Sequence, residues 1–279
     1  MSSGIPFSQL DILIRCLPLL EDLVLDGDEI FCCPSEWEEW MDIVYPSTPP
    51  ALTGMLELHF PGGMTQTPHI LRQLPGGIHF RTLNMWCHYG QGFHEAAELV
   101  VTCSETLEHL EIMREMDGTL DNASPFLQIR HPPEPFPTDV HPPGEINLSQ
   151  ATKLKEIVFR CEALGSGWVI RTLETITPKH RDFQRVSVCI ASGFGYVTAE
   201  DCRAVELDID DADPGMHWRD LNSLLVCLWE SRSVRTTVVC PQHHTMNGGR
   251  EMKDWTRYLL PEVMRRGNAD ITEEPSGIV

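Results

Sequence analysis

A short apolar pattern, L-x-x-L-x-L with other aliphatic or aromatic residues at the L positions, recurs along most of this chain. It constrains the fold strongly, because a strand with alternate inward residues cannot bury its apolar face alone and neighbouring strands must stack beside it. Two weaker copies begin at Thr53 and Val234. The five clear copies begin at Leu20, Phe80, Leu107, Leu154 and Phe183.

The seven copies start 33, 27, 27, 47, 29 and 51 residues apart. The short gaps lie close to the roughly 20 to 29 residues of a leucine-rich repeat, and each long gap equals one repeat plus an insertion of about 20 residues. Segments of helical periodicity lie between the copies, at 93–101, 169–176 and 218–228. We therefore predict an α/β fold, an irregular leucine-rich-repeat-like solenoid of about seven helix-strand units. Its parallel strands would form the concave face and its helices the convex face, with residues 1–279 as a single domain.

The pattern departs from a regular leucine-rich repeat in one respect. Eight residues after the first apolar position, where a regular repeat has Asn or Cys, the clear copies carry Asp28, His88, Glu115, Glu162 and Ala191. The side-chain ladder of a regular repeat is therefore not expected. An ordinary α/β domain whose strands happen to resemble one another is the alternative.

Two long segments interrupt the repeats. Residues 117–147 contain seven prolines, which rule out a helix or a central strand and indicate a surface insertion. Its Pro132-x-x-Pro135 could serve as a polyproline ligand, although a plain loop is the simpler interpretation. Residues 191–215 form an acidic insertion, with seven Asp and Glu residues. A calcium loop starting at Asp210 fits poorly there, because Ala and Pro occupy two of its ligand positions.

The C-terminal region predicts a capping helix over residues 254–267. Pro261 would bend this helix and Gly267 would end it. We expect it to cover the last repeat.

The net charge of -20 is graded along the chain. It disfavours nonspecific binding to nucleic acid or to an anionic membrane, and no apolar run approaches the roughly 20 residues that span a bilayer. Residues 1–71 carry 11 acids and one base, whereas residues 153–185 carry seven bases and four acids. This gradient favours a protein partner whose basic region meets the N-terminal repeats.

The cysteines and the N-terminus indicate a protein inside the cell, in the cytoplasm or nucleus. None of the ten cysteines forms a C-x-x-C pair, and most lie in apolar stretches typical of buried, reduced thiols. The N-terminal segment lacks the basic start of a signal peptide.

We find no catalytic motif in the sequence. A G-x-S-x-G nucleophile elbow and a P-loop are both absent. His243 and His244, beside Cys240, point to opposite faces if extended and favour a surface turn over a metal site. We therefore expect no enzyme activity, no cofactor and no metal. The alternative is an enzyme with an unrecognised metal site in the acidic insertion.

Positions three, five and seven of each copy should face the concave groove. Early copies place acids there, the third copy offers an aromatic anchor, and later copies place arginines there. The predicted partner-binding residues are Asp22, Asp26, Glu57, Asn84, Trp86, His109, Glu111, Arg160 and Arg185.

Several phrases, among them LTGMLELHFPGGMTQTPHILRQLPGGIHFRTL (52–83), LVVTCSETLEHLEI (99–112) and INLSQATKLKEIVF (146–159), resemble a large family of fungal F-box and leucine-rich-repeat-like proteins. The resemblance covers residues 20–267. It implies a substrate receptor of a cullin ubiquitin ligase, in which an N-terminal F-box docks on the adaptor and the solenoid recruits a target. Too few residues precede Leu20 to hold an F-box, so adaptor binding is expected only if an F-box lies upstream of this chain.

Overall fold

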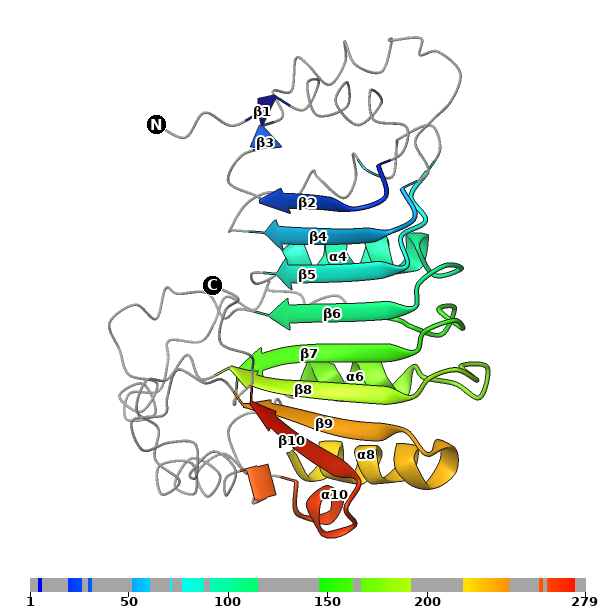
Figure 1. Ribbon diagram of the computed structural model, residues 1–279, viewed down its shortest axis with the longest axis vertical. Helices are drawn as coiled ribbons and strands as arrows, with labels where there is room; N and C mark the ends of the chain where they lie inside the picture. The colour runs from blue at the N-terminus through cyan, green and yellow to red at the C-terminus, as the bar shows by residue number, and fades with distance from the viewer. Residues whose placement is uncertain are drawn as a thin grey trace, which may run out of the picture. The chain divides into compact units, whose positions relative to one another are not determined.

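The computed structural model divides into two compact units. Unit 1 comprises residues 1–106 and 114–146, and unit 2 comprises residues 107–113 and 147–279. The structure describes residues 5–6, 20–26, 30–31, 52–60, 71, 77–87, 91–114, 146–162, 167–191, 218–240, 256–257 and 260–273. Figure 1 shows these residues in colour.

Unit 1 contains three parallel strands in chain order: β2 (Leu23–Asp26), β4 (Met55–Phe60) and β5 (Thr82–Cys87). Their register aligns Leu23 with Leu56 and Leu56 with Leu83. These are the fourth positions of the first three copies of the pattern, so the predicted alignment of these copies is confirmed. A separate parallel pair joins β1 (Ile5–Pro6) and β3 (Ile30–Phe31).

Unit 2 contains five parallel strands, again in chain order. Three follow clear copies of the pattern, with Leu110, Ile157 and Val186 side by side. The strands are β6 (His109–Arg114, its last residue in unit 1), β7 (Glu156–Glu162), β8 (Arg185–Ala191), β9 (Arg235–Cys240) and β10 (Ala269–Glu273). The α/β class with parallel strands is thus confirmed.

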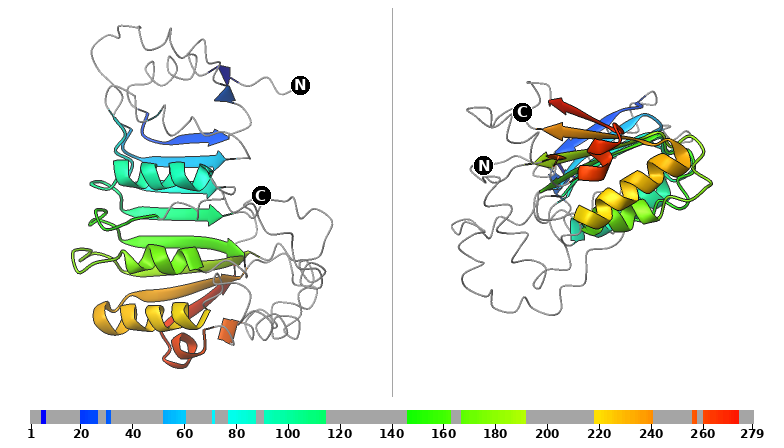
Figure 2. Two further views of the ribbon diagram at one scale, coloured as in Figure 1. Left: turned by 180° about the vertical axis from the view of Figure 1, so that it is seen from behind. Right: turned by 90° about the horizontal axis from the view of Figure 1, so that it is seen from below.

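The helices occupy the segments with helical periodicity and cover one face of the strands in each unit (Figure 2). They are α4 (Gln91–Thr102) in unit 1, and α6 (Gly167–Glu174) and α8 (Trp218–Arg232) in unit 2. Their apolar side chains and the alternate strand residues are buried together, with Leu83, Leu99, Phe159 and Leu221 at 0% exposure. This burial is the main favourable term for folding.

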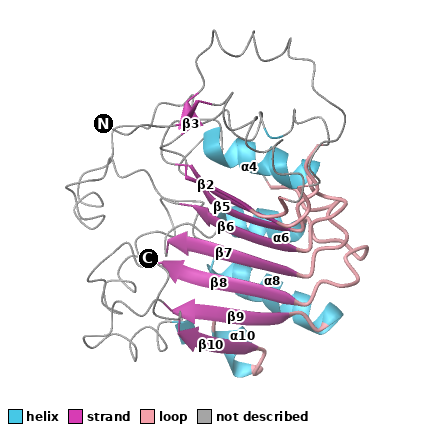
Figure 3. Cartoon of the chain, turned by 45° about the horizontal axis from the view of Figure 1, so that its top comes forward, coloured by secondary structure: helices cyan, strands magenta, loops and turns pink. Residues whose placement is uncertain are grey.

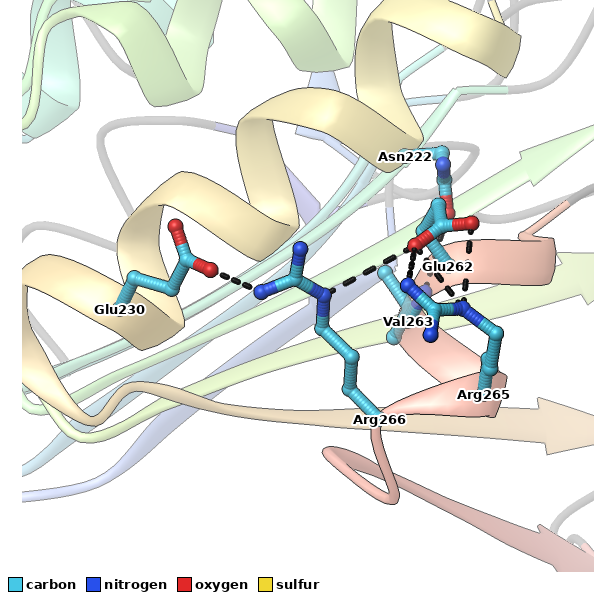
Figure 4. A network of polar contacts seen from close by, with 6 residues as sticks. All are labelled: Asn222, Glu230, Glu262, Val263, Arg265 and Arg266. Carbon is cyan, nitrogen blue, oxygen red and sulfur yellow. Dashed lines mark hydrogen bonds and ion pairs between the residues drawn. The ribbon is translucent and has the colours of Figure 1, made fainter.

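The predicted C-terminal helix is represented by helical residues Thr256 and Arg257 and by α10 (Pro261–Arg265). The N-cap residue, Leu260, has no side chain that can cap the helix. Instead, Asn222 of α8 accepts a hydrogen bond from the Val263 backbone N–H through its Oδ1, at 3.2 Å (Figure 4). A cap of this kind satisfies one of the free N–H groups at a helix start.

The predicted stop at Gly267 is confirmed. Gly267 has φ +68, and its N–H and that of Asn268 bond to the carbonyls of Met264 and Val263, which is the glycine-ended Schellman arrangement. The chain then continues into β10, an additional strand that the seven-copy pattern did not predict. Its sequence, ADITE, has only Ala269 and Ile271 as apolar positions, which is typical of a short strand and too weak to recognise as a repeat.

The predicted frame of the last copy is wrong by one residue. We expected Thr237 and Val239 to face inward, but Thr236 and Val238 are the buried residues, and they align with Val186 and Val188. The cause is the end of α8, where Ser233 adopts φ 59 and its N–H bonds to the Trp229 carbonyl. This tight connection removes one residue from the turn, and a shift of one residue exchanges the two faces of a strand.

Several predictions concern residues outside the described part of the chain. The proline-rich insertion is described only at residues 146–147, and the acidic insertion only at residue 191. His243 and His244 also lie outside it.

Candidate functional site

In each unit the strand residues that alternate with the core point away from the helices. We call the resulting surfaces the unit 1 open face and the unit 2 open face (Figure 3). The unit 1 open face is formed by Val24, Met55, Glu57, Thr82, Asn84 and Trp86. The unit 2 open face is formed by His109, Glu111, Met113, Glu156, Val158, Arg160, Arg185, Arg235, Thr237 and Val239, and the alternating residues Ser187 and Cys189 on the same side are buried.

The unit 1 open face combines apolar and polar side chains. Val24 is 59% exposed on β2, which is unusual for a large aliphatic residue, and Trp86 and Asn84 are half-buried on β5. Asn84 contacts the Met55 sulfur at 3.6 Å across the strand pair. Glu57 is the one charged side chain that the structure describes on this face. Of the predicted site residues, this face brings together Glu57, Asn84 and Trp86.

The two aspartates predicted for this groove have different positions. Asp26 is the last residue of β2, and its side chain lies outside the described part of the structure. The carboxylate of Asp22 accepts a hydrogen bond from the Met55 backbone N–H at 2.7 Å. Gly54 lies against it, since a Cβ there would come within 2.3 Å of Asp22 Oδ1 and 2.7 Å of the Glu21 carbonyl oxygen. Asp22 therefore holds β4 beside β2.

The charged residues of the unit 2 open face, apart from Arg235, pair with one another. Arg160 Nε is bonded to Glu111 Oε1, and both side chains are less than a quarter exposed. Glu156 lies between Arg185, at 3.4 Å, and His109, at 3.7 Å. The structure thus brings together the predicted residues His109, Glu111, Arg160 and Arg185, but in internal pairs.

Sequence reasoning missed a set of polar contacts at the edge where the strands of unit 2 begin. The Leu148 backbone N–H donates to Thr175 Oγ1 at 2.9 Å, and His180 Nε2 donates to the Leu148 carbonyl at 2.9 Å. The other ring nitrogen of His180, Nδ1, lies 3.1 Å from the Thr177 backbone nitrogen and 3.0 Å from the Thr177 carbonyl oxygen. Arg232 donates to the Thr177 carbonyl at 2.6 Å.

These contacts connect three successive turns, which precede β7, β8 and β9. They satisfy backbone N–H and C=O groups of these turns. Unit 1 has a related contact, from Thr106 Oγ1 to the Phe80 carbonyl at 3.1 Å. No sequence motif marks these residues, because Thr, His and Arg are common in turns.

The described residues offer little for catalysis. Among them no group of three or more His, Cys, Asp or Glu side chains could hold a metal ion. Burial raises the pKa of the Cys103 thiol to about 11, against a smaller opposing effect of its hydrogen bond with the Phe80 backbone, so this cysteine is a poor nucleophile. Within the same part of the chain, no helix is long and apolar enough to cross a membrane.

Comparisons with family models, with curated proteins and with solved structures found no match to this chain.

Proposed function

We propose that this protein is a non-catalytic interaction scaffold that binds a protein partner on the unit 1 open face. One observation carries the proposal: among the described residues, helices cover only one face of the parallel strands in unit 1. Parallel sheets are normally covered on both faces. The other face, which no described helix covers, holds an exposed valine and a half-buried tryptophan, and aromatic residues are enriched at the centres of protein interfaces.

The partner segment is expected to be basic. Glu57 lies on the face itself, and residues 1–71 carry 11 acids against one base. Attraction between opposite charges speeds association and excludes wrong partners more than it raises affinity. The apolar contacts with Trp86, Met55 and Val24 would supply most of the affinity, because removing apolar surface from water is the dominant favourable term in most associations.

We also propose that the repeats stack as an irregular leucine-rich-repeat-like solenoid. The recurrent 27-residue spacing, the shared strand register within each unit and the helix after β5 and β7 support this arrangement. From the resemblance to F-box proteins we further propose that the bound partner is a target of a ubiquitin ligase.

The double variant Trp86→Ala with Glu57→Lys tests the binding face. It removes the aromatic anchor and reverses the acid, so we expect capture of the partner from cell lysate to fall about tenfold or more, as for loss of a hot-spot residue. Quantitative mass spectrometry of the captured proteins would measure this loss. Thermal unfolding would show that the variant is folded.

The matched control is Val101→Ala with Glu105→Lys, on and just after α4. Val101 is 55% exposed, and Glu105 is exposed and lies on the helix side of the same unit. This control makes the same kinds of change and the same change in net charge, so capture should stay near the wild-type level. Equal capture by both variants, or equal loss in both, would contradict binding on the unit 1 open face.

A further inference from the structure

Five exposed cations gather at the edge of unit 2 where β7, β8 and β9 begin. We call this cluster the basic edge. It consists of Lys153, Lys179, Arg181, Arg185 and Arg235. In Figure 3 the turns that precede these strands are drawn in pink.

Hydrogen bonds between successive turns bring these residues together. His180, between Lys179 and Arg181, bonds to Leu148 in the turn that also contains Lys153. Arg232, just before β9, bonds to Thr177 in the turn that precedes β8. The strand register then places Arg185 directly beside Arg235. The cluster therefore follows from the packing of three repeats and is not a run in the sequence.

The basic edge has few internal counter-charges. Within the described residues, Lys153, Lys179, Arg181 and Arg235 form no ion pair, and Arg185 has a single contact with Glu156 at 3.4 Å. Like charges directly opposite each other on neighbouring strands destabilise a sheet. Arg185 and Arg235 are such a pair. The arrangement is unexpected in a protein of net charge -20, where acids outnumber bases by 41 to 21.

We propose that the basic edge binds an acidic segment of a protein partner. This site is distinct from the unit 1 open face and does not depend on the function proposed above. Three neighbouring strands span only about 10 Å, the length of about three extended residues. Carboxylates of a peptide can be spaced to meet the cations and to avoid the acids Glu156, Glu174 and Asp182 nearby.

A nucleic acid fits this edge less well than an acidic peptide. Its phosphates form a continuous line of charge that needs a longer track of cations. The same acids, and the overall negative charge, would repel the rest of such a strand.

The test measures binding of a fluorescein-labelled oligoglutamate peptide by fluorescence anisotropy at low ionic strength. We expect the wild-type chain to bind it, and the variants Arg181→Glu and Arg235→Glu to bind it about tenfold more weakly each. Within the described residues neither arginine has an ion-pair partner to lose, so neither variant should lower the melting temperature. If one fails to fold, Arg181→Gln or Arg235→Gln should still weaken binding several-fold.

Arg219→Glu is the matched control. Arg219 is exposed at the opposite end of α8, and its reversal changes the net charge by the same amount, so binding should stay near the wild-type level. Three results would overturn the proposal: no binding of the peptide by the wild type, an equal loss in Arg219→Glu, or tighter binding of an oligothymidylate of matched charge. The last would show that the edge serves nucleic acid.

Discussion

The open faces of the two units follow the same alternation of buried and outward residues, but their outward side chains make different kinds of contact. On the unit 1 open face the described side chains are mostly uncharged, with Trp86, Met55 and Val24 as apolar contacts. On the unit 2 open face, charges pair across strands, as Glu111 does with Arg160. The charged residues that the sequence places on a face are therefore not all available for contact with a partner, because some pair with one another.

Strand register explains the difference. Glu156 lies directly between His109 and Arg185, and Glu111 lies one step diagonally from Arg160. Side chains in these positions are about 5 to 8 Å apart at Cβ, within reach of long charged groups. In unit 1 the neighbours of Glu57 in the register are Val24 and Asn84.

Among the variants that test this difference between the two faces, Gly54→Ala is expected to have the largest effect on stability. The new methyl group would collide with the Glu21 carbonyl as well as with the Asp22 carboxylate, and the backbone cannot move aside without separating β2 from β4. We expect a loss of about 2 kcal/mol or more in the free energy of unfolding of unit 1. Hydrogen exchange should show lost protection in β2 and β4.

Thr53→Ala, at the neighbouring half-buried position, is the control and should change exchange in these strands little. Retained protection of β2 and β4 in Gly54→Ala would mean that the close approach of Asp22 and Gly54 is not needed to hold the unit 1 open face together.

An intermediate effect is expected at the Glu111–Arg160 pair. Glu111→Gln removes one charge of a pair whose side chains are less than a quarter exposed, and we expect a loss of about 1 to 2 kcal/mol, between the values for exposed and buried pairs. Replacing both residues by Leu should cost less than the single change, because both charges of this pair are then removed together. Chemical denaturation of the double variant, together with the single variants Glu111→Leu and Arg160→Leu, completes a double-mutant cycle.

A coupling energy near zero in this cycle would contradict the difference drawn between the two open faces. Glu111 and Arg160 would then not stabilise each other, and their charges would be available to a partner. Glu111→Lys is a poor probe of partner binding, because it would place a lysine beside Arg160 and so bring two cations together.

The smallest effect is expected at Glu262 of α10, where the pairs are exposed (Figure 4). The hydrogen bond from Arg265 lowers the pKa of Glu262 below its ordinary value of 4.5, with a smaller contribution from the charge of the same residue. Because the folded pKa is the lower one, the pair stabilises fully above about pH 4.5 and loses this contribution as the pH falls through the folded value. The protection factors of the α10 amides, corrected for the intrinsic pH dependence of exchange, should therefore fall slightly in acid.

Salt should reduce this effect, and Glu262→Gln should remove its pH dependence. An equal acid response of α10 in the wild type and in Glu262→Gln would contradict a contribution of this pair to stability.

Much of the fold could be predicted because burial repeats in the sequence. The apolar positions of six copies align in the structure as the pattern predicts, from Leu23 beside Leu56 in unit 1 to Ile157 beside Val186 in unit 2. The copy at Val234 was misplaced, since the end of α8 in a left-handed residue is not visible in an apolar pattern. Strand β10 was missed because it has only two apolar positions.

The candidate sites could likewise be predicted only in part from the sequence. Alternation identified Glu57, Asn84, Trp86, Glu111 and Arg160 as outward residues, because the period of a strand is two. It did not show that Asp22 bonds to the Met55 backbone or that Arg160 pairs with Glu111. It also did not reveal the basic edge, whose five cations come from separate turns.

By itself, then, the sequence determined the α/β class, the parallel strands and the two faces of each strand, because each depends on the local period of apolar residues. The tertiary structure alone decided which outward charges of the described residues pair with one another. Those outcomes depend on distances of a few ångströms between residues that are about 30 to 50 positions apart in the chain, as in Glu156 with Arg185 and Glu111 with Arg160.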